Sequence, residues 1–223
     1  MKIFLDSANL QDVENGLARG HLSGITTNPS LLAKEPKANF YEHIKKIVKL
    51  IEADGRQLPL SVEVFATKPN EMVAQGQEIM QQIGYPQLNI KIPIGWDELQ
   101  AVYALAKHGI RVNCTCIFTE EQCVLAANSG ASYVSIFHCR LKDIGGDPVR
   151  VIGNTRRIFD IAGHKAEIIV GSIRMQTDIL EAHLAGGHIV TAGAKIIEQM
   201  SAHPATDKSV QGFLKDFQAW MAS

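Results

Sequence analysis

The chain has 223 residues, of which 46% are hydrophobic, and its formal net charge is −1. This composition excludes disordered and fibrous proteins and predicts a single globular domain over residues 1–223 with a large core. The 22 basic and 23 acidic residues form no basic block, so a small molecule is a more plausible partner than nucleic acid.

Short apolar runs alternate with helical patterns along the chain. The predicted strands, in chain order, are residues 2–5, 24–26, 60–65, 89–92, 112–117, 133–137, 167–170 and 188–191. The segments between them show apolar residues at a spacing near 3.6, most clearly in 40–51, 70–83, 98–107 and 120–128. Eight strand–helix units in so short a chain, without a glycine-rich nucleotide fingerprint, favour an α/β fold of the (β/α)₈ TIM-barrel class over a doubly wound sheet.

Several helix ends have local signals. The run Thr119-Glu120-Glu121-Gln122 fits a capping box in which Thr119 is the N-cap. Three glycines follow helical runs, as C-terminal caps do: Gly109, Gly130 and Gly163.

A further amphipathic segment, residues 207–221, follows the eighth unit and has no ninth strand to cover. Its apolar face carries Val210, Phe213, Leu214, Phe217 and Met221. This helix could pack on its own barrel or dock across a subunit boundary, and the pattern does not choose between the two.

Targeting signals and metal motifs are not apparent. Asp6 interrupts the first apolar run too early for a signal peptide, and no apolar stretch approaches a membrane span, so we expect a cytoplasmic protein without a membrane partner. Cys114, Cys116, Cys123 and Cys139 form no Cys-x-x-Cys motif, which favours reduced, buried thiols. None of the eight histidines falls in a zinc-binding arrangement, so the sequence implies no metal.

One lysine lies where an apolar strand pattern should exclude a charge. Lys91 is inside the run Leu88-Asn89-Ile90-Lys91-Ile92-Pro93. Burial disfavours an ammonium group, and the neutral amine is a nucleophile toward ketones and aldehydes. Lys91 is therefore the first candidate for Schiff-base chemistry. A structural ion pair with Glu63 is the alternative, although a buried pair of this kind adds little net stability.

Polar residues gather at the C-terminal ends of the predicted strands, where active sites lie in TIM barrels. They are Asp6, Thr26, Thr27, Asn28, Glu63, Lys91, Asn113, Thr115, Ser135, Arg140, Ser172 and Arg174. Buried polar groups are costly unless they are hydrogen-bonded, so this set predicts a mutual network.

Single members of the set also have ordinary explanations. Asp6 could be a helix N-cap, and Asn28-Pro29-Ser30 could be a turn. Arg140 and Arg174 could be surface charges. However, two arginines after strands six and seven, the second following Gly171-Ser172 at a predicted helix start, suit a phosphate monoester.

Together these residues resemble the transaldolase family, over essentially the whole chain. The segment Thr26-Thr27-Asn28-Pro29-Ser30 is the most specific motif. The other matching segments are Asp6, the rest of Gly24 to Leu32, Ile90-Lys91-Ile92-Pro93, Asn113-Cys114-Thr115 and Gly171-Ser172-Ile173-Arg174. The likeness is greatest to the small-subunit branch that includes fructose-6-phosphate aldolase. That branch forms decamers of pentamer rings, so the resemblance implies a homo-oligomer, pentamer or decamer, in which residues 207–221 pack on a neighbouring subunit.

The resemblance implies a class I, Schiff-base aldol mechanism without a cofactor. Lys91 would attack the C2 ketone of a ketose phosphate, while Glu63 and Thr115 hold a water that shuttles protons. Asp6 would take the C4 hydroxyl proton as the C3–C4 bond breaks, which leaves a three-carbon enamine on the lysine. The implied substrate-binding residues are Thr26, Asn28, Asn113, Ser135, Phe137, Arg140, Ser172 and Arg174.

Four residues bear on the fate of that enamine. In the aldolase branch the positions of Glu63 and Phe137 typically hold glutamine and tyrosine, and those of Asn113 and Ser135 hold smaller residues. All four favour a transaldolase of the pentose phosphate pathway. It would move dihydroxyacetone from fructose 6-phosphate or sedoheptulose 7-phosphate to erythrose 4-phosphate or glyceraldehyde 3-phosphate. The alternatives are fructose-6-phosphate aldolase, a relative that acts on a non-standard ketose, and a non-catalytic sugar-phosphate-binding barrel.

Two segments depart from the family pattern. Ile94-Gly95-Trp96 stands where threonine and glycine are common, so we expect a differently shaped sugar pocket. His138 and Cys139 stand where smaller or aliphatic residues are usual. We interpret His138 as a structural or pocket-lining group rather than a catalyst.

Overall fold

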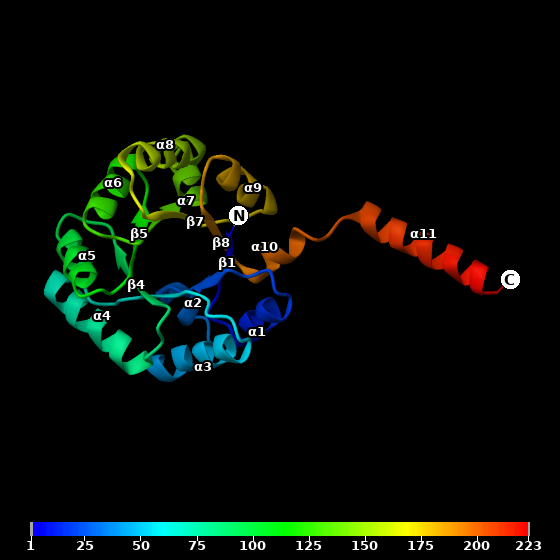
Figure 1. The fold of residues 1–223 in the computed structure, drawn as a ribbon, viewed down its shortest axis with the longest axis horizontal. Coiled ribbons are helices and arrows are strands. Elements are labelled where there is room, and N and C mark those ends of the chain that lie inside the picture. Colours follow the sequence, from blue (N-terminus) through cyan, green and yellow to red (C-terminus); the bar gives the residue numbers. More distant parts are fainter. Residues whose placement is uncertain (1, 223) are drawn as a thin grey trace.

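The computed structural model describes residues 2–222, which form a closed barrel of parallel strands surrounded by helices (Figure 1). The strands follow chain order around the barrel: β1 (Lys2–Asp6), β2 (Gly24–Thr26), β3 (Leu60–Glu63), β4 (Leu88–Pro93), β5 (Val112–Ile117), β6 (Tyr133–Phe137), β7 (Glu167–Gly171) and β8 (Ile189–Ala192). β8 pairs with β1 and closes the ring, with Val190 opposite Ile3. The predicted (β/α)₈ barrel is confirmed.

The helices cover the outside of the barrel, and one more lies beyond it. They are α1 (Leu10–Ala18), α2 (Pro29–Leu32), α3 (Phe40–Ala53), α4 (Pro69–Ile83), α5 (Glu98–Lys107), α6 (Glu120–Asn128), α7 (His138–Asp143), α8 (Pro148–Ala162), α9 (Gln176–Leu184), α10 (Ala194–Gln199) and α11 (Pro204–Met221). The capping box at Thr119 is confirmed. Gly163 is the C-cap of α8, as predicted, whereas Gly109 and Gly130 directly follow the C-caps His108 and Ser129. All three glycines have a left-handed backbone.

β3 is shorter than the predicted strand 60–65. The backbone N–H groups of Phe65 and Ala66 donate to the side chain of Gln75, at 2.7 and 2.9 Å. These donors are therefore satisfied by α4 rather than by a neighbouring strand, and the chain leaves the sheet after Glu63.

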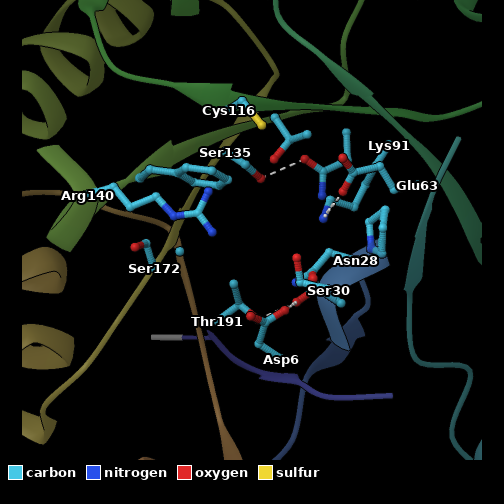
Figure 2. Close-up of a pocket in the computed structure, with 16 residues that line it drawn as sticks. Asp6, Asn28, Ser30, Glu63, Lys91, Cys116, Ser135, Arg140, Ser172 and Thr191 are labelled. Atoms are coloured by element: carbon cyan, nitrogen blue, oxygen red, sulfur yellow. Dashed lines mark hydrogen bonds and ion pairs between the residues drawn. The ribbon is translucent and has the colours of Figure 1, made fainter. Parts of the chain in front are cut away.

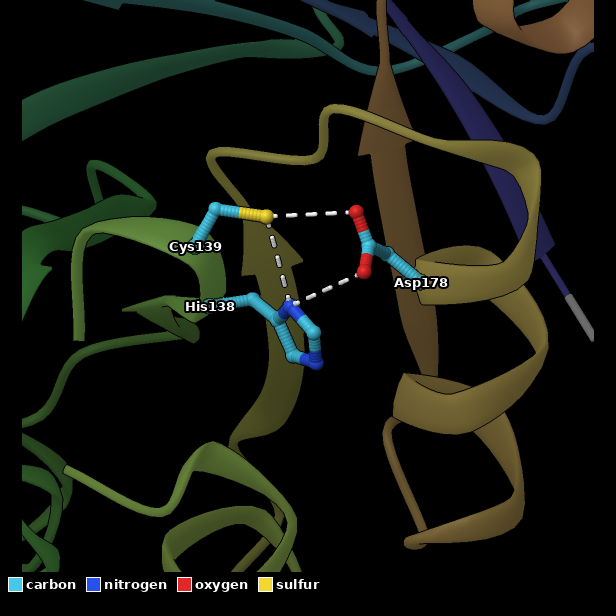
Figure 3. A group of neighbouring side chains, drawn as sticks. All are labelled: His138, Cys139 and Asp178. Carbon is cyan, nitrogen blue, oxygen red and sulfur yellow. Dashed lines mark hydrogen bonds and ion pairs between the residues drawn. The ribbon is translucent and has the colours of Figure 1, made fainter. Parts of the chain in front are cut away.

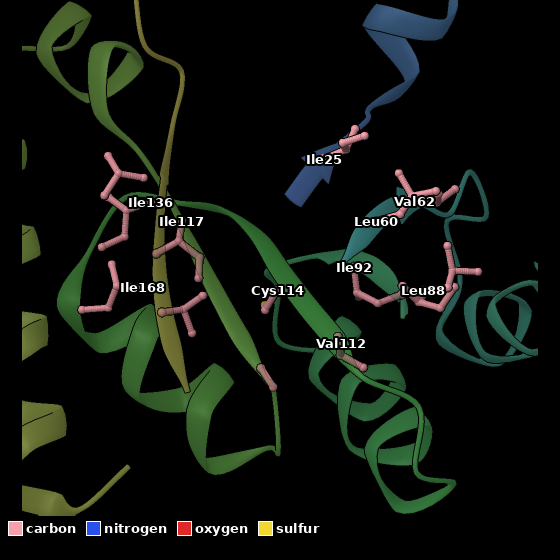
Figure 4. Close-up of a cluster of buried hydrophobic side chains, with 14 of the residues drawn as sticks. Ile25, Leu60, Val62, Leu88, Ile92, Val112, Cys114, Ile117, Ile136 and Ile168 are labelled. Carbon is pink, nitrogen blue, oxygen red and sulfur yellow. The ribbon is translucent and has the colours of Figure 1, made fainter. Parts of the chain in front are cut away.

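Alternate side chains of each strand point to opposite sides of the barrel wall. The outward set packs under the helices and forms the main core, which includes Ile25, Leu60, Val62, Leu88, Ile92, Val112, Cys114, Ile117, Ile136 and Ile168 (Figure 4). On β4, Leu88, Ile90 and Ile92 belong to this outward set. Asn89 and Lys91 alternate with them, so the period of two points these two polar side chains into the barrel.

The lower part of the barrel interior is closed by apolar side chains. Phe4, Ile169 and Ile189 form a separate buried cluster, and Tyr133 packs against it. Gly24 is required beside them, since a Cβ atom there would lie 2.5 Å from the Phe4 ring. Phe4 and Asp6 are two residues apart on β1, so both side chains point into the barrel. Phe4 contributes to the apolar floor, and the Asp6 carboxylate lies above it, toward the C-terminal end of the strand.

α11 begins at Pro204, three residues earlier than predicted, and extends away from the barrel (Figure 1). None of its residues is buried, and Val210, Phe213, Leu214, Phe217 and Met221 are all exposed. This helix therefore does not pack back on its own barrel. Within residues 2–222, no helix has both the length and the hydropathy needed to cross a membrane.

Candidate active site

A pocket of about 250 Å³ opens at the C-terminal ends of the strands (Figure 2). Its lining comprises Asp6, Thr26, Asn28, Pro29, Ser30, Glu63, Lys91, Asn113, Thr115, Cys116, Ser135, Phe137, Arg140, Gly171, Ser172 and Thr191. The structure thus brings together every catalytic and substrate-binding residue implied by the resemblance except Arg174. Of the wider polar set, Thr27 also lies outside the lining. Every strand, or the residue that follows it, contributes to the lining, and α2 adds Pro29 and Ser30 while α7 adds Arg140.

Lys91 lies in the wall of this pocket with only 6% of its surface exposed. β3 and β4 pair so that Glu63 is directly opposite Lys91, and Lys91 Nζ is 2.9 Å from Glu63 Oε2. The same amine donates a hydrogen bond to the backbone oxygen of Thr27, at 2.8 Å. The ion pair considered as an alternative therefore exists, but it lies in the pocket rather than apart from it, with a proton acceptor in direct contact with the amine.

Asp6 lies at the end of β1 and is held by Thr26, which in turn contacts Thr191. Thr26 Oγ1 is 2.7 Å from Asp6 Oδ1, to which it donates, and 2.6 Å from Thr191 Oγ1. Burial raises the pKa of Asp6, and the nearby Lys91 charge and the Thr26 hydrogen bond offset only part of that rise. The N-cap of α1 is Asn9, so Asp6 is not the helix cap that the sequence left open.

A second polar chain crosses β3, β5 and β6. Ser135 Oγ donates to Asn113 Oδ1 at 2.7 Å, and Asn113 Nδ2 donates to Ser61 Oγ at 3.2 Å. Thr115 Oγ1 is buried and has no hydrogen-bond partner of ordinary geometry among residues 2–222. A buried hydroxyl of this kind in a polar pocket is a natural place for a water or a substrate oxygen.

Two non-glycine residues of the rim have a left-handed backbone. Cys116 has a φ of 60° at the point where the register of β5 against β6 shifts, between Cys114 and Ile117. Ser172 has a φ of 58° directly after β7. Because the bulge adds one residue to the alternation, Thr115 and Cys116 both face the pocket. Backbone of this kind is uncommon outside glycine and often marks functional sites.

The two predicted arginines follow β6 and β7, and only Arg140 lines the pocket. The Arg140 guanidinium lies 4.6 Å from the centroid of the Phe137 ring, which in turn packs edge-on against Phe118. Arg174 is outside the lining, where its Nη1 donates to Asp143 Oδ1 of α7 at 2.7 Å. Arg140 therefore faces the pocket, whereas Arg174 is at the surface in an exposed ion pair.

Asn28 has both of the roles considered for it. Its side chain accepts from the backbone N–H of Leu31 at 3.0 Å and so caps α2, and it also lines the pocket. The turn chemistry of Asn28-Pro29-Ser30 is what places this motif at the rim.

The sequence reasoning missed four side chains of the lining. Pro29 and Ser30 belong to the motif already recognised, and Thr191 lies in β8 two residues after inward-facing Ile189, so these three had a signal. Cys116 had none, because a strict period of two directs it outward and only the bulge reverses that direction.

The two segments that depart from the family pattern lie outside the pocket. None of the residues 94–96 lines it, and Trp96 is 81% exposed. His138 is fully buried and does not line the pocket either. Of the structural and pocket-lining roles considered for it, only the structural role fits this position.

Comparison with known proteins gives one family. The model of the transaldolase/fructose-6-phosphate aldolase family matches residues 3–223. A probable transaldolase from Agathobacter rectalis is 42% identical over 98% of this chain and 98% of its own length. One from Geobacillus kaustophilus is 39% identical over 97% and 98%, respectively. A thiamine phosphate pyrophosphorylase from Pyrococcus furiosus has a similar structure, with a TM-score of 0.62 over 86% of this chain and 85% of that one. At 11% identity this likeness shows the fold alone.

Proposed function

The chain belongs to the transaldolase/fructose-6-phosphate aldolase family, and we propose that it is a transaldolase that uses a Schiff base on Lys91. The donor would be fructose 6-phosphate or sedoheptulose 7-phosphate, and the acceptor erythrose 4-phosphate or glyceraldehyde 3-phosphate. The observation that carries this proposal is the buried Lys91 amine in the pocket, 2.9 Å from a carboxylate. We further propose that the enzyme is cytoplasmic and serves the pentose phosphate pathway.

The first step needs a neutral amine. Glu63 Oε2 is close enough to take a proton from Lys91, after which the amine adds to the C2 carbonyl of the ketose. The resulting carbinolamine must gain a proton and lose water to become an iminium ion. The unpartnered hydroxyl of Thr115 and the Glu63 carboxyl are the groups that would hold the water for this transfer.

The second step breaks the C3–C4 bond. Asp6 would take the proton of the C4 hydroxyl, the bond electrons would flow to the iminium nitrogen, and the aldose phosphate would leave. A dihydroxyacetone enamine then remains on Lys91. The raised pKa of Asp6 supports this role, because a carboxyl that binds a proton more readily is a better base.

Substrate binding divides between hydroxyl and phosphate contacts. Thr26, Asn28, Asn113 and Ser135 offer hydrogen-bonding groups to the three-carbon unit, and Phe137 borders it. Arg140 and Ser172, on the other side, would contact the phosphate. Arg174 would join them by exchanging its exposed Asp143 partner for the phosphate.

Phe137 favours transfer over free aldol cleavage. Its ring has no hydroxyl with which to position a water against the enamine, so the acceptor aldose is the more accessible electrophile. Fructose-6-phosphate aldolase, which releases dihydroxyacetone, is the second candidate. Dihydroxyacetone released without an acceptor at a rate equal to transfer would favour that candidate.

Borohydride trapping tests the covalent step. Reduction of the protein in the presence of fructose 6-phosphate should convert the iminium to a stable secondary amine, seen as a mass adduct on the peptide that contains Lys91. Lys91→Arg is the control, since it keeps the charge but cannot form the adduct under the same conditions. If the wild-type protein gives no adduct, the Schiff-base proposal is wrong and a non-catalytic sugar-phosphate-binding barrel becomes the better reading.

We also propose a homo-oligomer, pentamer or decamer, in which α11 packs on a neighbouring subunit. The exposed apolar residues of α11 support this, because a helix of this kind is rarely left in water. The charge variant Phe213→Glu with Phe217→Glu should dissociate the assembly in sedimentation measurements. A wild-type protein that sediments as a monomer would refute the assembly.

A further inference from the structure

Three buried side chains between α7 and α9 bring a nitrogen, a sulfur and an oxygen together (Figure 3). His138 Nδ1 is 3.6 Å from Cys139 Sγ, which is 3.2 Å from Asp178 Oδ2. Asp178 Oδ1 is 4.0 Å from His138 Nδ1. All three residues are buried, and none of them lines the pocket around Lys91.

These separations are close to those of a tetrahedral metal centre. Zinc bonds of about 2.0–2.3 Å at tetrahedral angles place the ligand atoms roughly 3.4–3.6 Å apart. The nitrogen-to-sulfur spacing of 3.6 Å falls in that range. Asp178 has one oxygen 3.2 Å from the sulfur and the other 4.0 Å from the nitrogen, so a rotation of the carboxylate is needed to bring a single oxygen to both. The three ligand atoms already lie within 4.8 Å of one another. We propose that His138, Cys139 and Asp178 bind one Zn²⁺ ion, with a water completing the coordination.

The surroundings orient the imidazole and the carboxylate as ligands. Glu181 Oε2 lies 3.0 Å from His138 Nε2, in a contact that is not aligned as a hydrogen bond in this structure. A rotation of the imidazole that aligns it would favour the ring proton at Nε2 and leave Nδ1 to face the metal. Asp178 Oδ2 accepts from the backbone N–H groups of Arg174 and Met175, at 3.2 and 2.9 Å, and these bonds fix the carboxylate at the start of α9. A carboxylate behind a metal-binding histidine is the usual outer layer of a zinc site.

The charges balance when the ion is bound. On binding, the Cys139 thiol releases its proton to water and a sulfur–zinc bond forms, so the thiolate and Asp178 together neutralise the two positive charges of the ion. Outside this set, Lys142 Nζ pairs with Glu181 Oε2 at 2.6 Å and lies 3.4 Å from Asp178 Oδ1. The Lys142 side chain is 42% exposed, so its ammonium can move toward solvent as the ion enters.

The site would tie together two segments that follow neighbouring strands. α7 follows β6 and carries Arg140, and α9 begins shortly after Ser172 at the end of β7. A zinc ion held by residues of both helices would therefore be structural, with no part in the reaction. Sequence spacing does not reveal this cluster because Asp178 is 39 residues from Cys139.

Cobalt titration of the full chain tests the site without an activity assay. Protein stripped with a chelator should bind one Co²⁺ per chain and develop a thiolate-to-cobalt band in the near ultraviolet, with the visible bands of tetrahedral Co²⁺. Zn²⁺ should displace the cobalt and raise the melting temperature of the stripped protein. Absence of binding at micromolar metal, or a band without tetrahedral features, would overturn the proposal.

Variants separate this site from adventitious binding. Cys139→Ser should abolish the thiolate band, whereas the control Cys123→Ala, at a buried cysteine of the main core, should keep it. Asp178→Asn should weaken binding strongly, but it also removes a cap of α9. The milder Glu181→Gln keeps all three ligands and should lower affinity by about 10–100-fold.

Lys142→Met should change affinity in the opposite direction, several-fold tighter, because it removes a cation beside the ion. A band that persists in Cys139→Ser would overturn the proposal, as would equal affinity of Glu181→Gln and Lys142→Met for Co²⁺. Far-ultraviolet circular dichroism of each variant checks that it is folded.

Discussion

The two sides of the pocket hold their charged groups in different ways. On the β1 to β5 side, Lys91 and Glu63 lie on paired strands and contact each other, and Asp6 is held by Thr26. On the β6 and β7 side, Arg140 lies in α7, beyond the end of β6, and Arg174 forms an exposed ion pair. The side proposed for bond breaking is thus built into the barrel wall. The side proposed for phosphate binding lies beyond the strand ends, in α7 and in the segment before α9, which can adjust to substrates of different length.

Replacing Lys91 should lower kcat more than any other substitution, because it removes the amine proposed to form the Schiff base. Lys91→Met combined with Glu63→Gln, which avoids an unpaired buried carboxylate, should lower kcat by roughly 10⁴-fold or more. Turnover of the purified variant and the trapping experiment measure this. Glu63→Gln alone is the matched control and should still form the adduct. Residual turnover of the double variant above about 1% would show that the amine is not the nucleophile.

Asp6→Asn should separate activity from stability. It should lower kcat by about 10²–10⁴-fold, because the base is lost. It should also raise the melting temperature at neutral pH. Since burial raises the pKa of Asp6, the stability that its neutral form provides is complete below the ordinary carboxyl range and is lost as pH rises through the raised value. Asparagine stays neutral throughout.

The difference in melting temperature between Asp6→Asn and the wild type should therefore shrink as pH falls, which calorimetry from neutral to acidic pH will measure. Thr26→Ser, which keeps the hydroxyl donor to Asp6, serves as the control. A melting temperature that is lowered at neutral pH would contradict the burial argument.

Arg140→Met should weaken phosphate recognition on the adjustable side. Losing a charged hydrogen-bond partner costs about 1.5–3 kcal/mol, or roughly 10–150-fold in kcat/KM for phosphorylated ketoses. Unphosphorylated ketoses should be affected far less, and comparing the two substrate types is the measurement. An equal loss for both would place Arg140 in the chemistry or the fold instead.

Phe137→Tyr tests the boundary between the two sides. A tyrosine hydroxyl could position water against the enamine, so release of dihydroxyacetone should increase at the expense of transfer. The ratio of the two products, measured with and without glyceraldehyde 3-phosphate, reports this partition. Phe137→Leu, which adds no hydroxyl, is the control, and an unchanged ratio in Phe137→Tyr would refute the role given to the ring.

Asp143→Asn should have the smallest effect. It frees Arg174 from an exposed ion pair, which is worth at most about 1 kcal/mol, so the KM for phosphorylated substrates should fall by a factor of a few. The gain should diminish at high salt because exposed charges are screened. A rise in KM would indicate that the ion pair positions Arg174 for binding.

The rigid side follows from the sequence more readily than the adjustable side. Asp6 and Glu63 end their strands and Lys91 lies within β4, so the period of two and the closure of the barrel determine which way they face. The roles of the remaining predicted residues came from the family resemblance, for which Thr26-Thr27-Asn28-Pro29-Ser30 is the most specific motif. The closed ring itself, β8 on β1, follows from the number of strand–helix units.

The other features depend on interactions that local patterns do not encode. The Arg174 pair joins residues 31 positions apart, and the direction of Cys116 is set by a bulge that only the paired strands reveal. The Thr26–Thr191 contact spans 165 positions and exists because the barrel closes. Long-range pairing of this kind has no signature within a window of the sequence.

The sealed floor under the pocket has a kinetic consequence. Phe4, Ile169 and Ile189 fill the barrel beneath the reacting groups, so substrates and products share one mouth. In a transfer reaction the first aldose must therefore leave before the acceptor enters. Initial velocities measured at several fixed acceptor concentrations should then give parallel double-reciprocal lines, the pattern of a ping-pong order without a ternary complex.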